Sequence, residues 1–461
     1  MSDRDEFGPV LDEAVVLAGR WLEGVRDGPI PPTADVEQVK DALGRELPDR
    51  GPDPVTVLRS LARGAEPGLM RIHSPRFHGW VMGGAQPVAL GADWLTSAWD
   101  QNNGLRSVTP GVAGAEELAA EWLVDLLGLP SGSEVGFVTG ATVANVAGLL
   151  AGRDEVLRRA GWDAAADGLA GGPRIRVLVG AERHGSVDSA SAIAGLGHGR
   201  VIDVDDQGRM RVDALRAALD DGEGPAIVVL QAGNIHSGAF DPFEEAVEVA
   251  HAAGAWVHID GAFGLWAAAA PRLRWLMAGA EQADSWATDA HKTLNVPYDC
   301  GIVAVADPAA LHRTMAQHAA YLASSDTVAD PSDRVPELSR RARGVPVYAT
   351  LAQLGRSGVA DLVQQLADAA TAIAVGISGI PGAEILNEVV YTQVCAAFGY
   401  DERTRAIGAA LLADGTALAS PSTWHGRAVL RFSVSNWLTD QEEAARTVAA
   451  VERAVASVTV S

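Results

Sequence analysis

Between residues 85 and 310, short apolar runs alternate with longer helical stretches, and this alternation constrains the fold most. The runs are four to six residues long, and polar or glycine residues follow them. Such alternation is typical of a mostly parallel sheet that helices cover on both faces. Because ligands bind such sheets at the carboxyl ends of the strands, the residues that follow these runs are candidate site residues. We expect strands at residues 135–139, 175–179, 226–230, 256–259, 285–288 and 302–305.

The pattern changes on both sides of this region. Residues 1–65 indicate helices that proline-rich breaks separate. After about residue 345, long helices surround a few strands, which is typical of a smaller α+β domain. We therefore expect an N-terminal helical arm at 1–65, a large α/β domain at 66–344 and a small C-terminal α+β domain at 345–461.

Composition excludes several classes of function. The formal net charge of -23 repels phosphodiester backbones and anionic lipids, which argues against nucleic-acid and membrane partners. Cys300 and Cys395 lie far apart in the chain, so the sequence predicts neither a disulfide framework nor a metal site. The first residues are charged rather than apolar, and the apolar runs are shorter than the ~20 residues of a membrane span. We expect a cytoplasmic protein.

The segment Thr139-Gly-Ala-Thr-Val-Ala-Asn145 lies between a predicted strand and a predicted helix. Gly140 and Ala141 lack bulk, so backbone N–H groups there can approach an anion, which the helix dipole also attracts. The Thr142 hydroxyl offers a further hydrogen bond. An ordinary strand-to-helix turn explains the same pattern, and the segment has neither a Walker lysine nor a Gly-x-Gly-x-x-Gly spacing.

A second segment, His258-Ile-Asp-Gly-Ala-Phe-Gly264, places the carboxylate of Asp260 at the end of a predicted buried strand. A charge in that position is costly unless it meets a cation. A pyridinium N–H is one suitable partner, and an arginine side chain is the alternative. The small Gly261 and Ala262 leave space for a flat ring against the sheet.

Two histidine-containing segments each follow a predicted strand. In Asp289-Ala-His-Lys292, the lysine is a candidate Schiff-base nucleophile, because desolvation favours a neutral amine, and His291 could contact a phosphate. An isolated His-Lys pair is usually a surface feature, but this pair follows Asp260 by one helix and one strand. In Glu182-Arg-His-Gly-Ser186, His184 could stack on an aromatic ring or serve as a structural loop residue.

Together these four segments resemble the group II pyridoxal-phosphate (PLP) dependent amino-acid decarboxylases. That family includes glutamate, aromatic amino-acid and diaminobutyrate decarboxylases within the aspartate-aminotransferase superfamily. The resemblance spans roughly residues 70–440 and includes Arg76-Phe-His-Gly, the stretch 107–117 and Leu338-Ser-Arg-Arg-Ala-Arg343. It implies fold type I, pyridoxal 5'-phosphate as the cofactor, a small-molecule amino acid as the substrate, and a homodimer with the active site at the subunit interface.

The resemblance also implies roles for the matching residues. Lys292 carries the cofactor, Asp260 pairs with the pyridine nitrogen, and His184 stacks on the ring opposite Ala262. The implied catalytic residues are Lys292, His184, Asp260 and Tyr321. The implied cofactor-binding residues are Gly140, Ala141, Thr142, His184, Gln231, Asp260, Ala262, Asp289, His291 and Lys292.

The implied reaction is decarboxylation of an amino acid through an external aldimine and a quinonoid carbanion. The sequence departs from the family pattern at the loop 323–337, which lacks the usual proton-donating tyrosine, so that Tyr321 is the nearest phenol. Thr293 stands where many members have tryptophan, and Gln231 stands where threonine is common in aromatic amino-acid decarboxylases. The alternatives are an aldolase or another lyase, an aminotransferase, an oxidative deaminase, and a cofactor-binding protein without turnover. The missing glycine fingerprint argues against a dinucleotide-dependent oxidoreductase.

Overall fold

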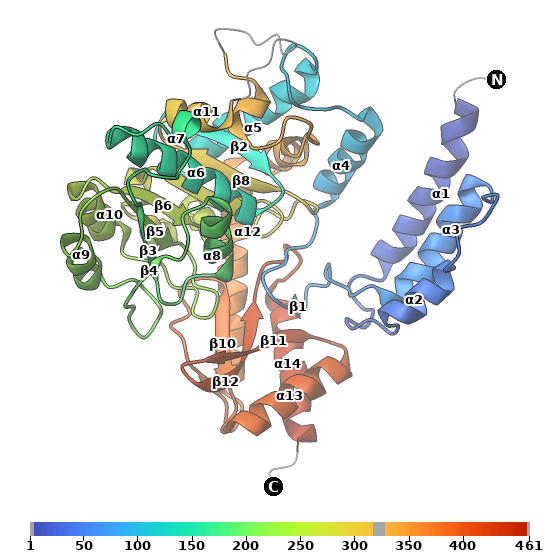
Figure 1. The fold of residues 1–461 in the computed structure, drawn as a ribbon. Helices are drawn as coiled ribbons and strands as arrows, with labels where there is room; N and C mark the ends of the chain where they lie inside the picture. The colour runs from blue at the N-terminus through green and yellow to red at the C-terminus, as the bar shows by residue number, and fades with distance from the viewer. Residues whose placement is uncertain (1–3, 317–327, 459–461) are drawn as a thin grey trace.

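A seven-stranded sheet forms the centre of the computed structural model, which describes residues 4–316 and 328–458 (Figure 1). Its strand order is β2-β8-β7-β6-β5-β3-β4, and β8 runs antiparallel to both of its neighbours. The other neighbouring pairs are parallel, so the expected mostly parallel sheet is confirmed. The strands are β2 (Glu134–Val138), β3 (Arg176–Gly180), β4 (Arg200–Ile202), β5 (Ala226–Gln231), β6 (Trp256–Asp260), β7 (Ser285–Asp289) and β8 (Gly301–Val305).

Helices cover both faces of this sheet because alternate strand residues point to opposite sides. In β5, Val228 and Leu230 pack into one core cluster, whereas Ile227 and Val229 pack into another. The first cluster includes residues of α5 (Pro110–Leu126), α9 (Val212–Asp220), α10 (Phe243–Ala252) and α12 (Gly344–Ser378). The second includes residues of α6 (Ala141–Arg159), α8 (Gly185–Ile193) and α11 (Pro308–Met315).

A five-stranded sheet with the order β1-β11-β12-β10-β9 lies at the other end of α12 (Figure 1). Its short strand β1 (Phe77–His78) pairs with β11, so a piece of the segment 66–344 joins the C-terminal sheet, which the expected boundary did not anticipate. We keep the three-part division otherwise as a proposal. The remaining elements of this part are β9 (Glu384–Ile385), β10 (Gln393–Ala397), β11 (Leu418–Trp424), β12 (Arg427–Ser433), α13 (Asp401–Asp414) and α14 (Gln441–Ser457).

Three N-terminal helices pack on one another and stand apart from both sheets in Figure 1. They are α1 (Arg4–Glu23), α2 (Val36–Leu43) and α3 (Pro54–Ala65), and α4 (Pro87–Trp99) lies between them and the large sheet. The described chain also contains a four-residue helix, α7 (Ala164–Asp167), and five 3₁₀ turns. These turns are Glu66–Gly68, Leu265–Ala269, Arg274–Met277, Ala280–Gln282 and Pro331–Arg334. Within the described residues, no helix combines the length and apolarity that a bilayer crossing requires.

A buried ion pair holds the segment that leads into α12. The Arg340 guanidinium contacts both carboxylate oxygens of Glu116 at 2.8 and 3.0 Å, and both side chains are almost fully buried. Arg340 also donates to the carbonyl of Phe137 at the end of β2, and Glu116 accepts the backbone N–H of Gly344. The pair therefore ties α5, β2 and the start of α12 together beside the sheet.

We predict that Arg340→Ala lowers the free energy of unfolding by about 3–5 kcal/mol, because it leaves the Glu116 carboxylate buried without its cation. Arg341→Ala is the matched control. The Arg341 guanidinium pairs with Asp93 at 2.7 Å, but both side chains are partly exposed, so its loss should cost about 1 kcal/mol or less. Urea unfolding followed by circular dichroism measures both values. Equal losses in the two variants would contradict the role given to Glu116.

Candidate active site

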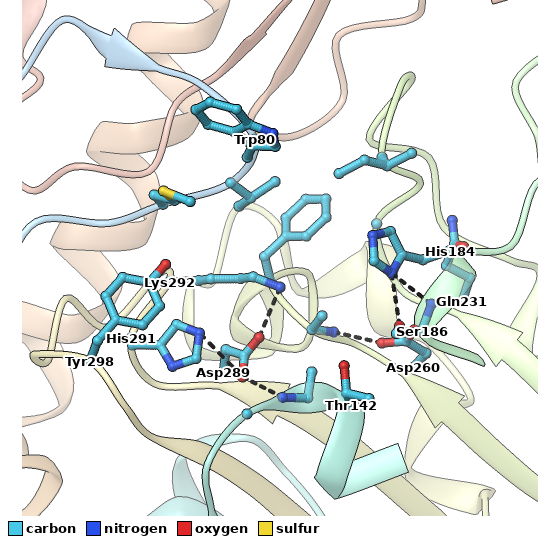
Figure 2. A pocket seen from close by; sticks show the side chains of 18 of the residues that line it. Trp80, Thr142, His184, Ser186, Gln231, Asp260, Asp289, His291, Lys292 and Tyr298 are labelled. Atoms are coloured by element: carbon cyan, nitrogen blue, oxygen red, sulfur yellow. Dashed lines mark hydrogen bonds and ion pairs between the residues drawn. The ribbon is translucent and has the colours of Figure 1, made fainter. Parts of the chain in front are cut away.

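A cavity of about 400 Å³ lies at the carboxyl ends of β5, β6 and β7, next to the first turn of α6 (Figure 2). This is the edge at which a parallel sheet binds ligands. All ten residues that the sequence predicted to bind a cofactor line it: Gly140, Ala141, Thr142, His184, Gln231, Asp260, Ala262, Asp289, His291 and Lys292. The remaining predicted site residue, Tyr321, lies outside the described residues.

The first turn of α6 forms one wall of the cavity. The helix begins at Ala141, and no side chain caps it at Gly140, so N–H groups of the first turn are available to a ligand. One of them, from Ala141, donates to Oδ1 of Asp289 at 2.6 Å. The turn lies close to β8, since a Cβ atom on Gly301 would be only 2.4 Å from the carbonyl carbon of Gly140. Glycine at 301 therefore lets the turn approach the strand.

The amine of Lys292 reaches into the cavity from the loop that follows β7. Its Nζ lies 2.8 Å from Oδ2 of Asp289, whose carboxylate is buried. The chain around Gly83 passes directly over this lysine, because a Cβ atom at Gly83 would be 2.2 Å from the Lys292 carbonyl oxygen. Trp80, Val81 and Met82 thereby line the same cavity.

His291 presents an N–H group to the same end of the cavity. Its Nδ1 accepts the backbone N–H of Cys300 at 3.1 Å, so the proton of the neutral ring is on Nε2. Burial lowers the pKa of His291, although the nearby Asp289 carboxylate opposes this shift. Together, the first turn of α6 and the Nε2–H of His291 supply donors suited to an anion.

Asp260 and His184 lie at the opposite end of the cavity (Figure 2). Burial raises the pKa of Asp260, whereas the positive charges of Lys292 and His184 oppose this shift. One carboxylate oxygen of Asp260 accepts the N–H of Ala262 at 3.2 Å. His184 caps α8 by accepting the N–H of Ser186 on Nδ1, and burial lowers the pKa of its imidazole. The cavity therefore combines an end with several N–H donors, a central amine and a buried carboxylate.

Sequence reasoning missed two titratable residues of this cavity. Arg431 lies on β12 of the C-terminal sheet, and its side chain lines the cavity. It is 6% exposed and donates to the carbonyl of Ile235 at 2.8 Å. Its Nε has no hydrogen-bond partner among the described residues, and burial lowers the pKa of its guanidinium to about 10. A single charge inside the apolar run 429–433 was a signal for it.

Tyr298 is the second missed residue, and its ring lies over His291 with 4.2 Å between the ring centroids. In Figure 2 its hydroxyl points toward the side of the cavity that Lys292 occupies. Burial, and to a smaller extent the Asp289 carboxylate, raise the pKa of the Tyr298 phenol to about 12. Nothing in the sequence alone indicated that this loop folds back over the cavity.

Comparison with known proteins identifies the family. The model of the pyridoxal-dependent decarboxylase conserved domain matches residues 37–398. The aromatic-L-amino-acid decarboxylase of Bacillus atrophaeus is 28% identical over 356 residues, which cover 74% of this chain and 71% of the relative. The L-2,4-diaminobutyrate decarboxylase of Rhizobium meliloti is 29% identical over 408 residues, which cover 85% of this chain and 80% of the relative.

Solved structures show the same fold. The crystal structure of Oryza sativa TDC with PLP and tryptamine superposes with a TM-score of 0.92 at 23% identity, covering 99% of this chain and 98% of that chain. Mouse CSAD superposes with a TM-score of 0.86 at 22% identity, covering 99% of this chain and 98% of that chain. Because the family model matches most of the chain, the protein belongs to the pyridoxal-dependent decarboxylases, and its cofactor is pyridoxal 5'-phosphate.

Proposed function

We propose that Lys292 carries PLP in this cavity and that the enzyme decarboxylates an amino acid there. One observation supports this most strongly: the Lys292 amine lies in the cavity between an anion-binding helix end and the buried Asp260 carboxylate. PLP has a phosphate, an aldehyde and a ring nitrogen, and the three parts of the cavity offer a matching group for each. When bound, PLP supplies an electron-withdrawing ring that stabilises the negative charge left at Cα when CO₂ departs.

The phosphate end is proposed to rest on the first turn of α6. The N–H groups of this turn, the Thr142 hydroxyl and Nε2–H of His291 are its donors. Asp289 already accepts the Ala141 N–H and pairs with Lys292, so it orders both groups around this end. Gln231 lines the same cavity from the end of β5 and belongs to the proposed cofactor-binding set.

Asp260 is proposed to hold the proton on the ring nitrogen. Its carboxylate is buried and has a cation to meet there, which offsets the cost of burying the charge. His184 and Ala262 are proposed to cover the two faces of the ring. His184 is suited to stacking because its Nδ1 hydrogen bond to Ser186 fixes the ring orientation.

Arg431 is proposed to bind the carboxylate of the amino-acid substrate. It is the one arginine among the described lining residues, and its Nε lacks a partner there. The cavity also has an apolar wall, which includes Trp80, Val81, Met82, Ile235 and Phe263. A wall of this chemistry favours a substrate with an apolar or aromatic side chain over one with a charged side chain.

The proton that replaces CO₂ at Cα needs a donor. We keep Tyr321, at the edge of the loop 323–337, as the proposed acid, and Tyr298 is the alternative that the described cavity offers. The phenol of Tyr298 stays protonated at neutral pH, because its pKa is raised to about 12. A protonated phenol is what a general acid requires.

A homodimer is proposed as the working unit. Exposed apolar side chains gather on the N-terminal helices and on α4, including Leu11, Val15, Val16, Trp94 and Leu95. Exposed apolar side chains in such numbers are usually covered by a partner, and a second copy of the chain is the partner that the family resemblance implies.

The cofactor lysine can be tested sharply, because the chain contains only two lysines, Lys40 and Lys292. Lys40 is exposed on α2, where it pairs with Glu37. We predict that borohydride reduction of the PLP-loaded enzyme labels the peptide that contains Lys292. The label should persist in Lys40→Arg and disappear in Lys292→Arg, as mass spectrometry of the digested protein would show. A label on Lys40, or none, would reject the assignment.

The arginine is tested through substrate binding. We predict that Arg431→Met raises KM for the amino acid by about tenfold or more, because charge-assisted hydrogen bonds to the carboxylate are lost. Arg431→Lys keeps the positive charge and should raise KM by a smaller factor. The cofactor content of each variant, measured by absorbance after alkaline release, should stay at the wild-type level. An unchanged KM in Arg431→Met would place the carboxylate elsewhere.

Product analysis distinguishes the two phenols. We predict that Tyr321→Phe lowers amine formation by about a hundredfold and raises aldehyde by-products, because the carbon that lost CO₂ is no longer protonated efficiently. Tyr298→Phe is the matched variant and should keep the wild-type product ratio. If only Tyr298→Phe changes the ratio, then Tyr298 is the acid. If neither variant does, the proton comes from another group.

A further inference from the structure

A chain of hydrogen bonds runs behind the cavity, between the sheet and α6. Trp256 Nε1 donates to Ser285 Oγ at 2.9 Å, and Ser285 Oγ lies 2.8 Å from His258 Nδ1. His258 Nε2 lies 2.9 Å from Oδ1 of Asn145. Each of the four residues is at most 1% exposed, so no water competes for these contacts.

The face of α6 is shaped to fit this chain. A Cβ atom on Gly148 would be 2.6 Å from the His258 ring, and one on Gly152 would be 2.6 Å from the Trp256 ring. Asn145, Gly148 and Gly152 are spaced by three and four residues, so they lie on one face of the helix. Larger residues at the two glycines would push the helix off the sheet. The same helix begins at the proposed phosphate site, so its placement affects both ends of the cofactor.

The hydrogen bonds in this chain have a defined direction. The indole N–H of Trp256 can only donate, so the Ser285 hydroxyl accepts it and has its own proton available for Nδ1 of His258. Burial lowers the pKa of His258 to about 3, so the ring is neutral. Its single proton is then on Nε2 and is donated to Oδ1 of Asn145. The Asn145 amide is thereby fixed with its NH₂ group on the other side.

That NH₂ group is directed to Asp260. Nδ2 of Asn145 is buried and has no hydrogen-bond partner within residues 4–316 and 328–458, and the Asn145 amide lowers the pKa of Asp260, against the larger effect of burial. Asp260 follows His258 by two residues in β6, so both side chains point to the same face of the sheet. If the hydrogen bonds ran in the reverse direction, Oδ1 of Asn145 would face the Asp260 carboxylate, and the two oxygens would repel each other.

We propose that Ser285, His258 and Asn145 act as positioning residues that present an N–H donor to Asp260 and keep its carboxyl ionised for the ring nitrogen of PLP. This inference rests on the role proposed for Asp260. None of the four residues of the chain lines the cavity, so they act through Asp260 rather than on the substrate. His258 is the central residue, because its single proton sets the orientation of Asn145.

Two substitutions of His258 separate the effect of its hydrogen bond to Asn145 from the effect of its packing. His258→Gln retains a neutral N–H donor for Asn145, whereas His258→Leu fills the space without one. The readout is the nitrogen-15 chemical shift of the ring nitrogen of labelled PLP bound to each variant, together with the PLP dissociation constant. We expect a protonated ring nitrogen in wild type and His258→Gln. In His258→Leu we expect loss of this proton and PLP binding weaker by about tenfold or more.

Trp256→Phe is the matched control at the far end of the chain. It removes the indole donor, but the Ser285 hydroxyl can still donate its proton to Nδ1 of His258, so PLP affinity should change by about twofold or less. Circular dichroism and thermal melting check that each variant folds. If His258→Leu does not fold, Ser285→Ala takes its place. Ser285→Ala frees the His258 proton to move between the ring nitrogens, and it should also lower the protonated fraction.

Two results would overturn different parts of the account. The first result concerns the folded variant that is tested, His258→Leu or its replacement Ser285→Ala. If its ring nitrogen stays fully protonated and its PLP affinity is unchanged, the positioning role is wrong while the role of Asp260 stands. If wild type itself has an unprotonated ring nitrogen, or Asp260→Asn leaves the nitrogen protonated, the role proposed for Asp260 is wrong.

Discussion

The buried carboxylate of Asp260 is the constraint on which the rest of the site depends. It lies at the end of a central strand, 4% exposed, where an unpaired charge would be costly. The surrounding structure offsets that cost with the positive charge of Lys292 and with the N–H of Ala262, and the Asn145 amide is proposed to add a second donor. In the role proposed for Asp260, the protonated ring nitrogen of PLP would complete this compensation.

The helix α6 makes this arrangement rigid. Its first turn faces the proposed phosphate site, and Asn145 in its second turn acts on Asp260. Gly148 and Gly152 then allow the next turns to lie against His258 and Trp256. The first turn of α6 and Asn145 are therefore placed relative to Asp260 by a single helix packed on a single sheet. Sites built on such elements hold their geometry better than sites on loops.

The sequence predicted the parts of the site that follow from local pattern. Asp260 and Lys292 could be placed together because each follows a buried apolar run, and parallel strands end at one edge. Arg431 could not be placed there, because the folding of the C-terminal sheet against the large one brings it in. Tyr298 depends on the path of one loop, and the Asn145–His258 contact depends on how α6 packs. These are tertiary facts that residue spacing does not encode.

The central claim is that this cavity releases CO₂ from an amino acid. The most direct measurement incubates the PLP-loaded enzyme with single amino acids that have aromatic, aliphatic, acidic or basic side chains, and quantifies CO₂ and primary amine together. The account predicts equal amounts of both products, with the highest rate for an apolar or aromatic side chain. Release of no CO₂ from any amino acid, together with amino-group transfer or cleavage of β-hydroxy amino acids, would contradict it.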